Sequence, residues 1–180
     1  MIIHEIIEGT SVNGPGLRLC VWVQGCKRDC PGCFNKEACR MTGGKEISVN
    51  QIIDLLIKGD YQGLSVSGGE PFYQSQELGI LLKKAKLLGY DTLVFTGYKY
   101  EELYPVHKNT LKYCDYLIDG PYKKDIPSCC KYAGSGNQRF LHLVDGLISE
   151  DLTESTENIE QCEIFIDVEG RIVKTGFFDL

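Results

Sequence analysis

The segment Leu17-Arg-Leu-Cys-Val-Trp-Val23 leads into the segment Cys26-Lys-Arg-Asp-Cys30-Pro-Gly-Cys33. The first segment contains β-branched and aromatic residues, which predict a strand. The second segment places three cysteines within eight residues, and its Pro31 and Gly32 are typical of a loop. We therefore expect a strand that delivers the chain into a loop of three thiols.

The three thiols of Cys26, Cys30 and Cys33 indicate a metal site that lacks a fourth protein ligand. A cubic four-iron cluster held by three thiolates keeps one iron without a protein ligand. An open position of this kind distinguishes a catalytic metal site from a structural one. The alternative is a structural zinc site in which Cys39 or a distant residue is the fourth ligand. Zinc sites favour paired ligand sets, however, and the chain has no second Cys-x-x-Cys.

Strand and helix patterns alternate along the chain. Further strands are expected at residues 63–67, 92–96 and 116–118, and helices at 49–58, 78–88 and near Glu101. This order predicts an α/β fold with a mostly parallel sheet. Because a complete eight-fold barrel takes ~250 residues, we expect a partial, open β/α barrel.

The C-terminal part has a different character. Residues 149–163 contain six acids and no base, which is typical of an exposed linker. Residues 163–168 and 171–175 predict a terminal hairpin. We therefore assign a main domain to residues 1–148, and the linker and hairpin to residues 149–180, packed on the same domain.

Composition limits the classes of partner and the compartment. The net charge is −6 and the pI is near 5.1, which argues against binding to nucleic acid or to an anionic membrane. The one dense basic spot, Lys27-Arg28, lies inside the cysteine loop and is expected to serve the site or a partner. Nine cysteines without an export signal favour a reducing compartment, so we expect a cytoplasmic location.

Two motifs together resemble those of a known superfamily. Cys-x-x-x-Cys-x-x-Cys after the first strand resembles the signature of the radical S-adenosylmethionine enzymes, and Ser67-Gly68-Gly69-Glu70-Pro71 resembles their Gly-Gly-Glu motif. Two glycines at a strand end let backbone groups approach a cofactor closely. Alone, Gly-Gly-Glu-Pro could be a strand-to-helix turn with Pro71 at the first helical position.

A finer resemblance covers nearly the whole chain. It rests on four segments, at residues 13–18, 30–35, 119–122 and 134–139. They are similar to segments of the anaerobic ribonucleoside-triphosphate reductase activating proteins, and more loosely of pyruvate formate-lyase activating enzymes. The resemblance implies a [4Fe-4S] cluster, reductive cleavage of S-adenosylmethionine and a 5′-deoxyadenosyl radical. That radical takes a hydrogen atom from a backbone glycine of a large glycyl-radical enzyme, with a low-potential electron donor such as flavodoxin or ferredoxin.

The resemblance also implies residue roles. The cluster ligands are Cys26, Cys30 and Cys33. The cofactor-binding residues are Gly32, Cys33, Phe34, Gly68, Gly69, Glu70, Thr96 and Asp119. These residues follow predicted strands, and parallel sheets bind ligands beyond the carboxyl ends of their strands. Gln138 and Arg139 could contact the partner, brace the fold, or begin a local helix.

Some features leave alternatives open. Many superfamily members carry an aromatic residue before the third cysteine, whereas Gly32 stands here and narrows the subgroup to the reductase-activating group. The acidic segment and hairpin extend beyond the compact form of that group. The alternatives are a radical S-adenosylmethionine enzyme that acts on a small molecule or peptide, and a non-catalytic zinc or iron–sulfur interaction module. Among the other cysteines, Cys20, Cys114 and Cys162 are expected in the core, and Cys129-Cys130 could be an exposed redox pair.

Overall fold

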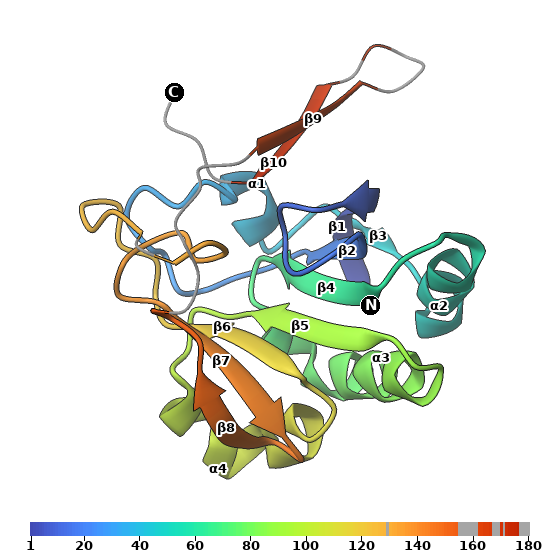
Figure 1. Ribbon diagram of the computed structural model, residues 1–180. Coiled ribbons are helices and arrows are strands. Elements are labelled where there is room, and N and C mark those ends of the chain that lie inside the picture. Colours follow the sequence, from blue (N-terminus) through green and yellow to red (C-terminus); the bar gives the residue numbers. More distant parts are fainter. Residues whose placement is uncertain (129, 155–161, 167–169, 171, 177–180) are drawn as a thin grey trace.

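The computed structural model describes residues 1–180 apart from 129, 155–161, 167–169, 171 and 177–180. The described chain forms an eight-stranded sheet of order β3-β1-β2-β4-β5-β6-β7-β8 and a separate ribbon of β9 and β10 (Figure 1). The strands are β1 Ile2–Thr10, β2 Arg18–Val23, β3 Lys45–Glu46, β4 Gly63–Gly68, β5 Asp91–Phe95, β6 Tyr116–Asp119, β7 Arg139–Val144, β8 Leu147–Asp151, β9 Cys162–Ile166 and β10 Ile172–Gly176. The helices are α1 Lys36–Cys39, α2 Val49–Lys58, the 3₁₀ helix Pro71–Gln74, α3 Ser75–Leu87 and α4 Tyr100–Leu111.

The centre of the sheet is parallel, as the alternating pattern predicts. Strands β2, β4, β5 and β6 run in the same direction. Two further strands, joined by antiparallel pairing, extend the sheet on each side: β1 and β3 next to β2, and β7 and β8 next to β6. The sequence patterns did not predict these four strands. A turn at Asp145-Gly146, with positive φ at both residues, joins β7 to β8. Residues 149–151, expected in the acidic linker, therefore belong to β8.

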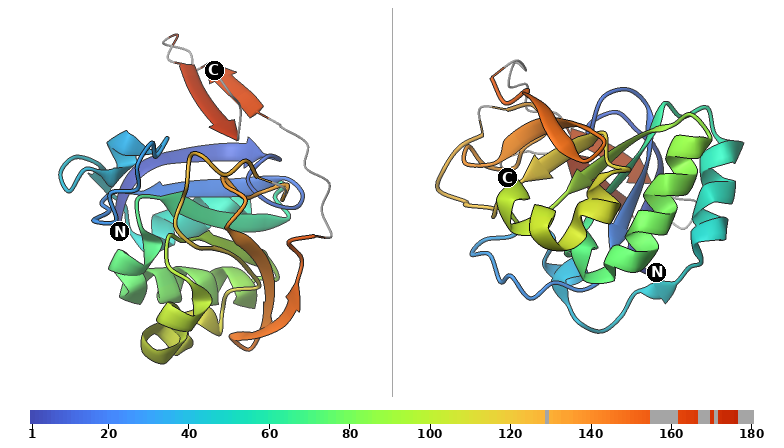
Figure 2. Two further views of the ribbon diagram at one scale, coloured as in Figure 1. Left: turned by 90° about the vertical axis from the view of Figure 1, so that its left-hand side faces the viewer. Right: turned by 90° about the horizontal axis from the view of Figure 1, so that it is seen from below.

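Helices cover one face of this sheet. The view from below in Figure 2 shows α2, α3 and α4 side by side across it. Helix α2 begins at Ser48, whose side chain and that of Gln51 form the predicted capping box. Helix α3 buries Leu78, Leu81, Leu82 and Ala85, as its spacing predicts. Within the described residues, none of the helices is long and apolar enough to cross a membrane.

Two separate segments cover the opposite face. Side chains alternate along β2, so that Val21 packs in the core on the helix side while Trp22 belongs to a cluster on the other side. The segment at residues 121–138 packs against β5, β6 and β7 through a cluster that includes Tyr132. The β9–β10 hairpin packs on β1 and β2 through Phe165 and Val173. The two segments therefore cover different strands of this face.

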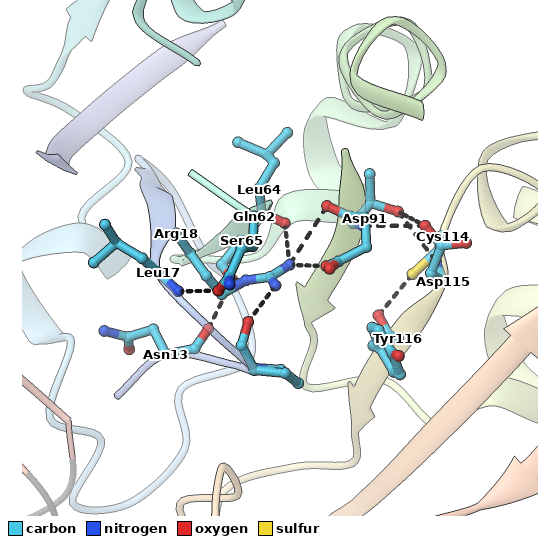
Figure 3. Close-up of polar contacts among 12 residues, drawn as sticks. Asn13, Leu17, Arg18, Gln62, Leu64, Ser65, Asp91, Cys114, Asp115 and Tyr116 are labelled. Atoms are coloured by element: carbon cyan, nitrogen blue, oxygen red, sulfur yellow. Dashed lines mark hydrogen bonds and ion pairs between the residues drawn. The ribbon is translucent and has the colours of Figure 1, made fainter. Parts of the chain in front are cut away.

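A buried arginine joins the amino ends of the central strands. Arg18 is fully buried and forms an ion pair of 2.5 Å with Asp91 at the start of β5. Its Nε donates to Ser65 Oγ in β4 at 2.7 Å, and its Nη1 donates to the carbonyl of Pro15 at 2.8 Å. Ser65 Oγ in turn donates to the carbonyl of Asn13 (Figure 3). Arg18 therefore fixes β2, β4, β5 and the loop before β2 to one another.

The cysteines outside the motif are distributed mostly as expected. Cys20 and Cys114 are buried, which confirms their predicted place in the core. Cys162 is exposed, so its predicted burial was wrong, because its side chain faces outward from β9. Cys130 is buried rather than exposed, and Cys129 lies outside the described residues.

Candidate active site

A cavity of about 460 Å³ lies at the carboxyl ends of β2, β4 and β5. The predicted site residues that line it are Cys26, Cys30, Cys33, Phe34, Gly68, Gly69, Glu70 and Thr96. Gly32 and Asp119 are not among its lining residues, although Gly120 is. The structure therefore brings segments that are up to 70 residues apart in sequence to one edge of the sheet.

The cysteine loop is held by the short helix α1. The N–H of Gly25 donates to the carbonyl of Ala38 at 2.7 Å, and the N–H of Cys26 donates to that of Cys39 at 3.0 Å. Within the loop, the N–H of Cys33 donates to the carbonyl of Cys30 at 3.1 Å. These backbone bonds fix the positions of the thiols without using the thiols themselves.

A fourth thiol lies beside the three of the motif. The Cys39 sulfur is 3.9 Å from that of Cys33, and Cys39 also lines the cavity. Burial, together with the neighbouring Cys33 and Cys26, raises the pKa of Cys39 to about 12. Burial is also the main cause that raises the pKa of the Cys26 thiol. The sequence predicted Cys39 only as a possible fourth ligand of the alternative zinc site, because it lies near the cysteine loop.

The three motif thiols, those of Cys26, Cys30 and Cys33, lie along the wall of one cavity. A cubic four-iron cluster accepts its thiolates at separate corners. The donor set therefore matches a four-iron cluster with one open position.

The two glycines of the Gly-Gly-Glu turn lie against the base of the cysteine loop. A Cβ on Gly69 would be 2.3 Å from the carbonyl oxygen of Gly25, and one on Gly68 would be 2.5 Å from the backbone of Val23. The N–H of Gly69 donates to the carbonyl of Val23, and that of Glu70 to the carbonyl of Gly25. These two N–H groups tie the turn to the end of β2 and to the start of the cysteine loop. The approach of the glycine backbone to a cofactor stays a prediction.

The Glu70 carboxylate connects the ends of β4 and β5. Its side chain is buried and accepts hydrogen bonds from Thr96 Oγ1 at 2.9 Å, the Gly97 N–H at 2.9 Å and the Phe72 N–H at 3.1 Å. Burial raises the pKa of Glu70, although these donors and the charge of Arg28 act to lower it. Glu70 therefore holds the Thr96-Gly97 turn in place at the floor of the cavity.

The sequence predicted only that the basic pair Lys27-Arg28 serves the site or a partner, and Arg28 lines the cavity. Its guanidinium carbon lies 4.4 Å from the ring centre of Tyr98, in a cation–π contact. Its buried Nε has no hydrogen-bond partner within the part of the chain that the structure describes. The basic pair Lys27-Arg28 inside the loop was the available signal. The charge of Arg28 acts on the Glu70 carboxylate, which lines the same cavity.

Aromatic side chains border the same cavity. Phe34, predicted to line the cofactor, is 56% exposed, and its ring centre is 4.5 Å from that of Tyr122. Tyr122 follows β6 and is the last residue of the motif at residues 119–122. Both residues line the cavity. They offer an exposed apolar edge at which a planar group could stack.

Asp119 and Arg139 form a buried connection outside the cavity lining. The Asp119 carboxylate accepts from Arg139 Nε at 2.9 Å and from the Tyr100 N–H at 2.7 Å, and Arg139 also pairs with Glu101. The predicted helix start at this point is wrong, because Arg139 begins strand β7. Arg139 therefore braces the end of β6 against the start of α4.

Gln138 closes the turn before β7 and also borders the cavity. Its Oε1 accepts from the Gly134 N–H at 2.9 Å, and its Nε2 donates to the carbonyl of Gly120 at 2.9 Å. These bonds favour the bracing role among the alternatives for this residue. Because Gln138 lines the cavity as well, it holds the wall formed by Gly120 and Gly134.

The terminal hairpin supplies one side of the cavity. Lys174, Thr175 and Gly176 of β10 line it, together with Asn13 from the loop before β2. Asn13 Nδ2 donates to Thr175 Oγ1 at 2.6 Å and to Thr10 Oγ1 at 3.0 Å. No local sequence pattern indicated this contact, which joins residues 162 positions apart.

Comparison with known proteins places the chain in a family. Residues 12–141 match the family described as a 4Fe-4S single cluster domain. The anaerobic ribonucleoside-triphosphate reductase-activating proteins of Enterobacteria phage T4 and Escherichia coli K12 are 36% and 35% identical to this chain. Each match covers 78% of this chain, and 93% and 97% of those proteins.

A second kind of activating enzyme is also similar. The pyruvate formate-lyase-activating enzyme of Clostridium pasteurianum is 31% identical over 88% of this chain and 73% of its own length. The family match at residues 12–141 includes the cysteine loop and the Gly-Gly-Glu turn. With its three-thiol loop at one cavity, the chain belongs to the 4Fe-4S single cluster family, among the anaerobic ribonucleoside-triphosphate reductase-activating proteins.

Proposed function

We propose that this chain cleaves S-adenosylmethionine reductively and generates a glycyl radical on an anaerobic ribonucleotide reductase. One observation carries the proposal: the thiols of Cys26, Cys30 and Cys33 and the Gly68-Gly69 turn line the same cavity. The activating proteins that this chain resembles are named for that reductase. The open mouth of the cavity suits a protruding loop of a large protein better than an enclosed small substrate.

The chain's own residues would hold and shield the cofactors. Cys26, Cys30 and Cys33 would bind three of the four irons and leave one position for the amino and carboxylate groups of S-adenosylmethionine. When bound, the reduced cluster supplies one electron to the sulfonium. Because Gly69 has no Cβ, which would lie 2.3 Å from the carbonyl oxygen of Gly25, the Gly-Gly-Glu turn can lie directly against the cysteine loop.

The other predicted cofactor-binding residues would form the surroundings of S-adenosylmethionine. Phe34, with Tyr122, would stack against the cofactor's planar base. Glu70 would keep Thr96 and Gly97 at the methionine end through its three hydrogen bonds. Gly32, at a φ of +74°, would turn the loop between the last two thiols. Asp119 would act indirectly by fixing the chain at Gly120.

The wider architecture belongs to the same proposal. The sheet would curve as a partial β/α barrel around the cavity. The radical domain, expected at residues 1–148, would extend to residue 151 so that it contains all of β8, and the following residues would be its addition. The reducing environment suited to nine thiols would be the cytoplasm, with flavodoxin or ferredoxin as electron donor. The negative net charge gives no reason to expect nucleic acid or membrane as a partner.

A reconstitution experiment tests the function. The full chain, loaded anaerobically with iron and sulfide, is mixed with reductant, S-adenosylmethionine and an anaerobic ribonucleotide reductase. We expect methionine and 5′-deoxyadenosine as products and a glycyl radical signal on the reductase by electron paramagnetic resonance. A protein that binds zinc but no iron, or one that leaves the reductase without a radical, would contradict the proposal.

Substitution of Gly69 tests the close packing of the turn. In Gly69→Ala, the added Cβ meets the Gly25 carbonyl at 2.3 Å, so the turn and the cysteine loop have to move apart. We expect weaker S-adenosylmethionine binding and a large loss of cleavage, measured by isothermal titration and by methionine release. Gly79→Ala, in helix α3, is the control, since Gly79 has no positive φ and the nearest atom to such a Cβ is the side-chain oxygen of Thr110 at 3.1 Å. Equal losses in both variants would refute this role.

A further inference from the structure

The β9–β10 hairpin has two faces with different surroundings. Its inner face packs on the sheet through Phe165 and Val173. Its outer face carries three isoleucines, Ile164, Ile166 and Ile172, which are 58%, 69% and 59% exposed. Ile166 and Ile172 are directly paired across the two strands. Exposed apolar clusters of this kind mark protein interaction sites in soluble proteins.

The hairpin is attached to the body at fixed points. Ser11 Oγ donates to the Glu163 carboxylate at 2.6 Å, and Asn13 Nδ2 donates to Thr175 Oγ1 at 2.6 Å. A two-stranded ribbon is only marginally stable in water by itself. The inner-face packing and these two hydrogen bonds therefore hold the outer face in a defined orientation, and Figures 1 and 2 show the ribbon standing out from the body.

The outer face borders the active-site cavity at one residue. Ile164 is paired with Lys174, and Lys174 lines the cavity together with Gly176. A protein that inserts a glycine into this cavity has to lie over its rim, and β10 forms part of that rim. The hairpin lies outside residues 12–141, the part of the chain that matches the family.

We propose that the outer face of the hairpin, formed by Ile164, Ile166 and Ile172, is the docking surface for an apolar patch on the glycyl-radical enzyme. The proposal rests on the proposed function, which requires that enzyme to approach this cavity. The hairpin selects the partner and positions its glycine, and it takes no part in the cleavage of S-adenosylmethionine. Substitutions on this face should therefore weaken binding of the glycyl-radical enzyme and leave cleavage of S-adenosylmethionine unchanged.

The double variant Ile164→Thr/Ile172→Thr tests the docking surface. Threonine keeps the β-propensity of these strand positions and removes apolar area. With the full, reconstituted chain, we expect the Kd for the anaerobic ribonucleotide reductase to rise by about ten- to a hundredfold. The glycyl radical yield at subsaturating reductase should fall in parallel. Cleavage of S-adenosylmethionine with dithionite in the absence of the reductase should equal that of the wild type.

The control is Ile57→Gln, at an isoleucine of α2 that is 54% exposed, and we expect no change in its Kd. An unchanged Kd in the double variant overturns the docking surface. A wild-type dimer that the same double substitution dissociates also overturns it, because a second copy of the chain then occupies this face. A wild-type chain that cleaves S-adenosylmethionine but leaves the reductase unbound and without a radical overturns the proposed function and this surface together.

Discussion

Cys30→Ala is expected to abolish reductive cleavage of S-adenosylmethionine. The variant keeps only two of the three motif thiols, and a cubic cluster with fewer thiolates is not held in the site. The measurement is the iron and sulfide content after anaerobic reconstitution, followed by release of methionine. We expect the variant to stay folded, because Cys30 is only partly buried and lies in a loop outside the hydrophobic core clusters.

Substitution of the neighbouring Cys39 tests which cysteines bind the cluster. Cys39 lies 3.9 Å from Cys33 and lines the same cavity, but it lies outside the three-cysteine motif. We expect Cys39→Ala to retain iron, sulfide and cleavage. If instead Cys39→Ala loses the cluster while Cys30→Ala keeps it, Cys39 is a ligand and the motif has been assigned wrongly. Cys162→Ala, at an exposed thiol on the hairpin, controls for general thiol loss.

Arg18→Ala is expected to lower the free energy of unfolding by about 3 kcal/mol or more, because several buried acceptors lose their donor at roughly 1–3 kcal/mol each. Its ion-pair partner Asp91 is 37% exposed, so the loss of the pair itself adds little. The side chain is fully buried and bonds to Ser65 Oγ and to the carbonyls of Pro15 and Leu64. Its removal leaves these acceptors without their donor in a dry environment, which costs more than the lost pair itself. Urea unfolding of the metal-free chain measures the change.

A surface arginine provides the matched control. Arg40 forms an ion pair of 2.8 Å with Glu37, and both side chains are more than half exposed. Because solvent screens such a pair, we expect Arg40→Ala to change the free energy of unfolding by less than about 1 kcal/mol. Similar losses in the two variants would show that Arg18 does not join the strands as described.

The local patterns of the chain predicted most of the central architecture. The capping box at Ser48, the leucine spacing of α3 and the strands β2, β4, β5 and β6 were found where expected. These features depend on neighbours within a few residues, which a sequence displays directly. Strands β1, β3, β7 and β8 were not predicted, because their pairing depends on partners elsewhere in the chain.

The terminal hairpin was predicted as an element but not in its role. Alternating residues around Gly170 indicated two strands, and β9 and β10 are present. The Asn13–Thr175 hydrogen bond and the Phe165 packing on β2 depend on a contact that no local pattern encodes. The hairpin's position at the cavity thus became visible only in three dimensions.

The types of residue and their spacing indicate the chemistry of the site without the structure. Three thiols at this spacing and a Gly-Gly-Glu turn at a strand end identify a cluster with an open position, because ligand type and ligand number are properties of the residues themselves. The assembly of the site depends on the tertiary structure. Glu70 holds Thr96, Arg28 lies against Tyr98 and β10 closes one side of the cavity, because these contacts join segments far apart in the chain. The proximity of Cys39 to Cys33 depends on how the loop between them folds.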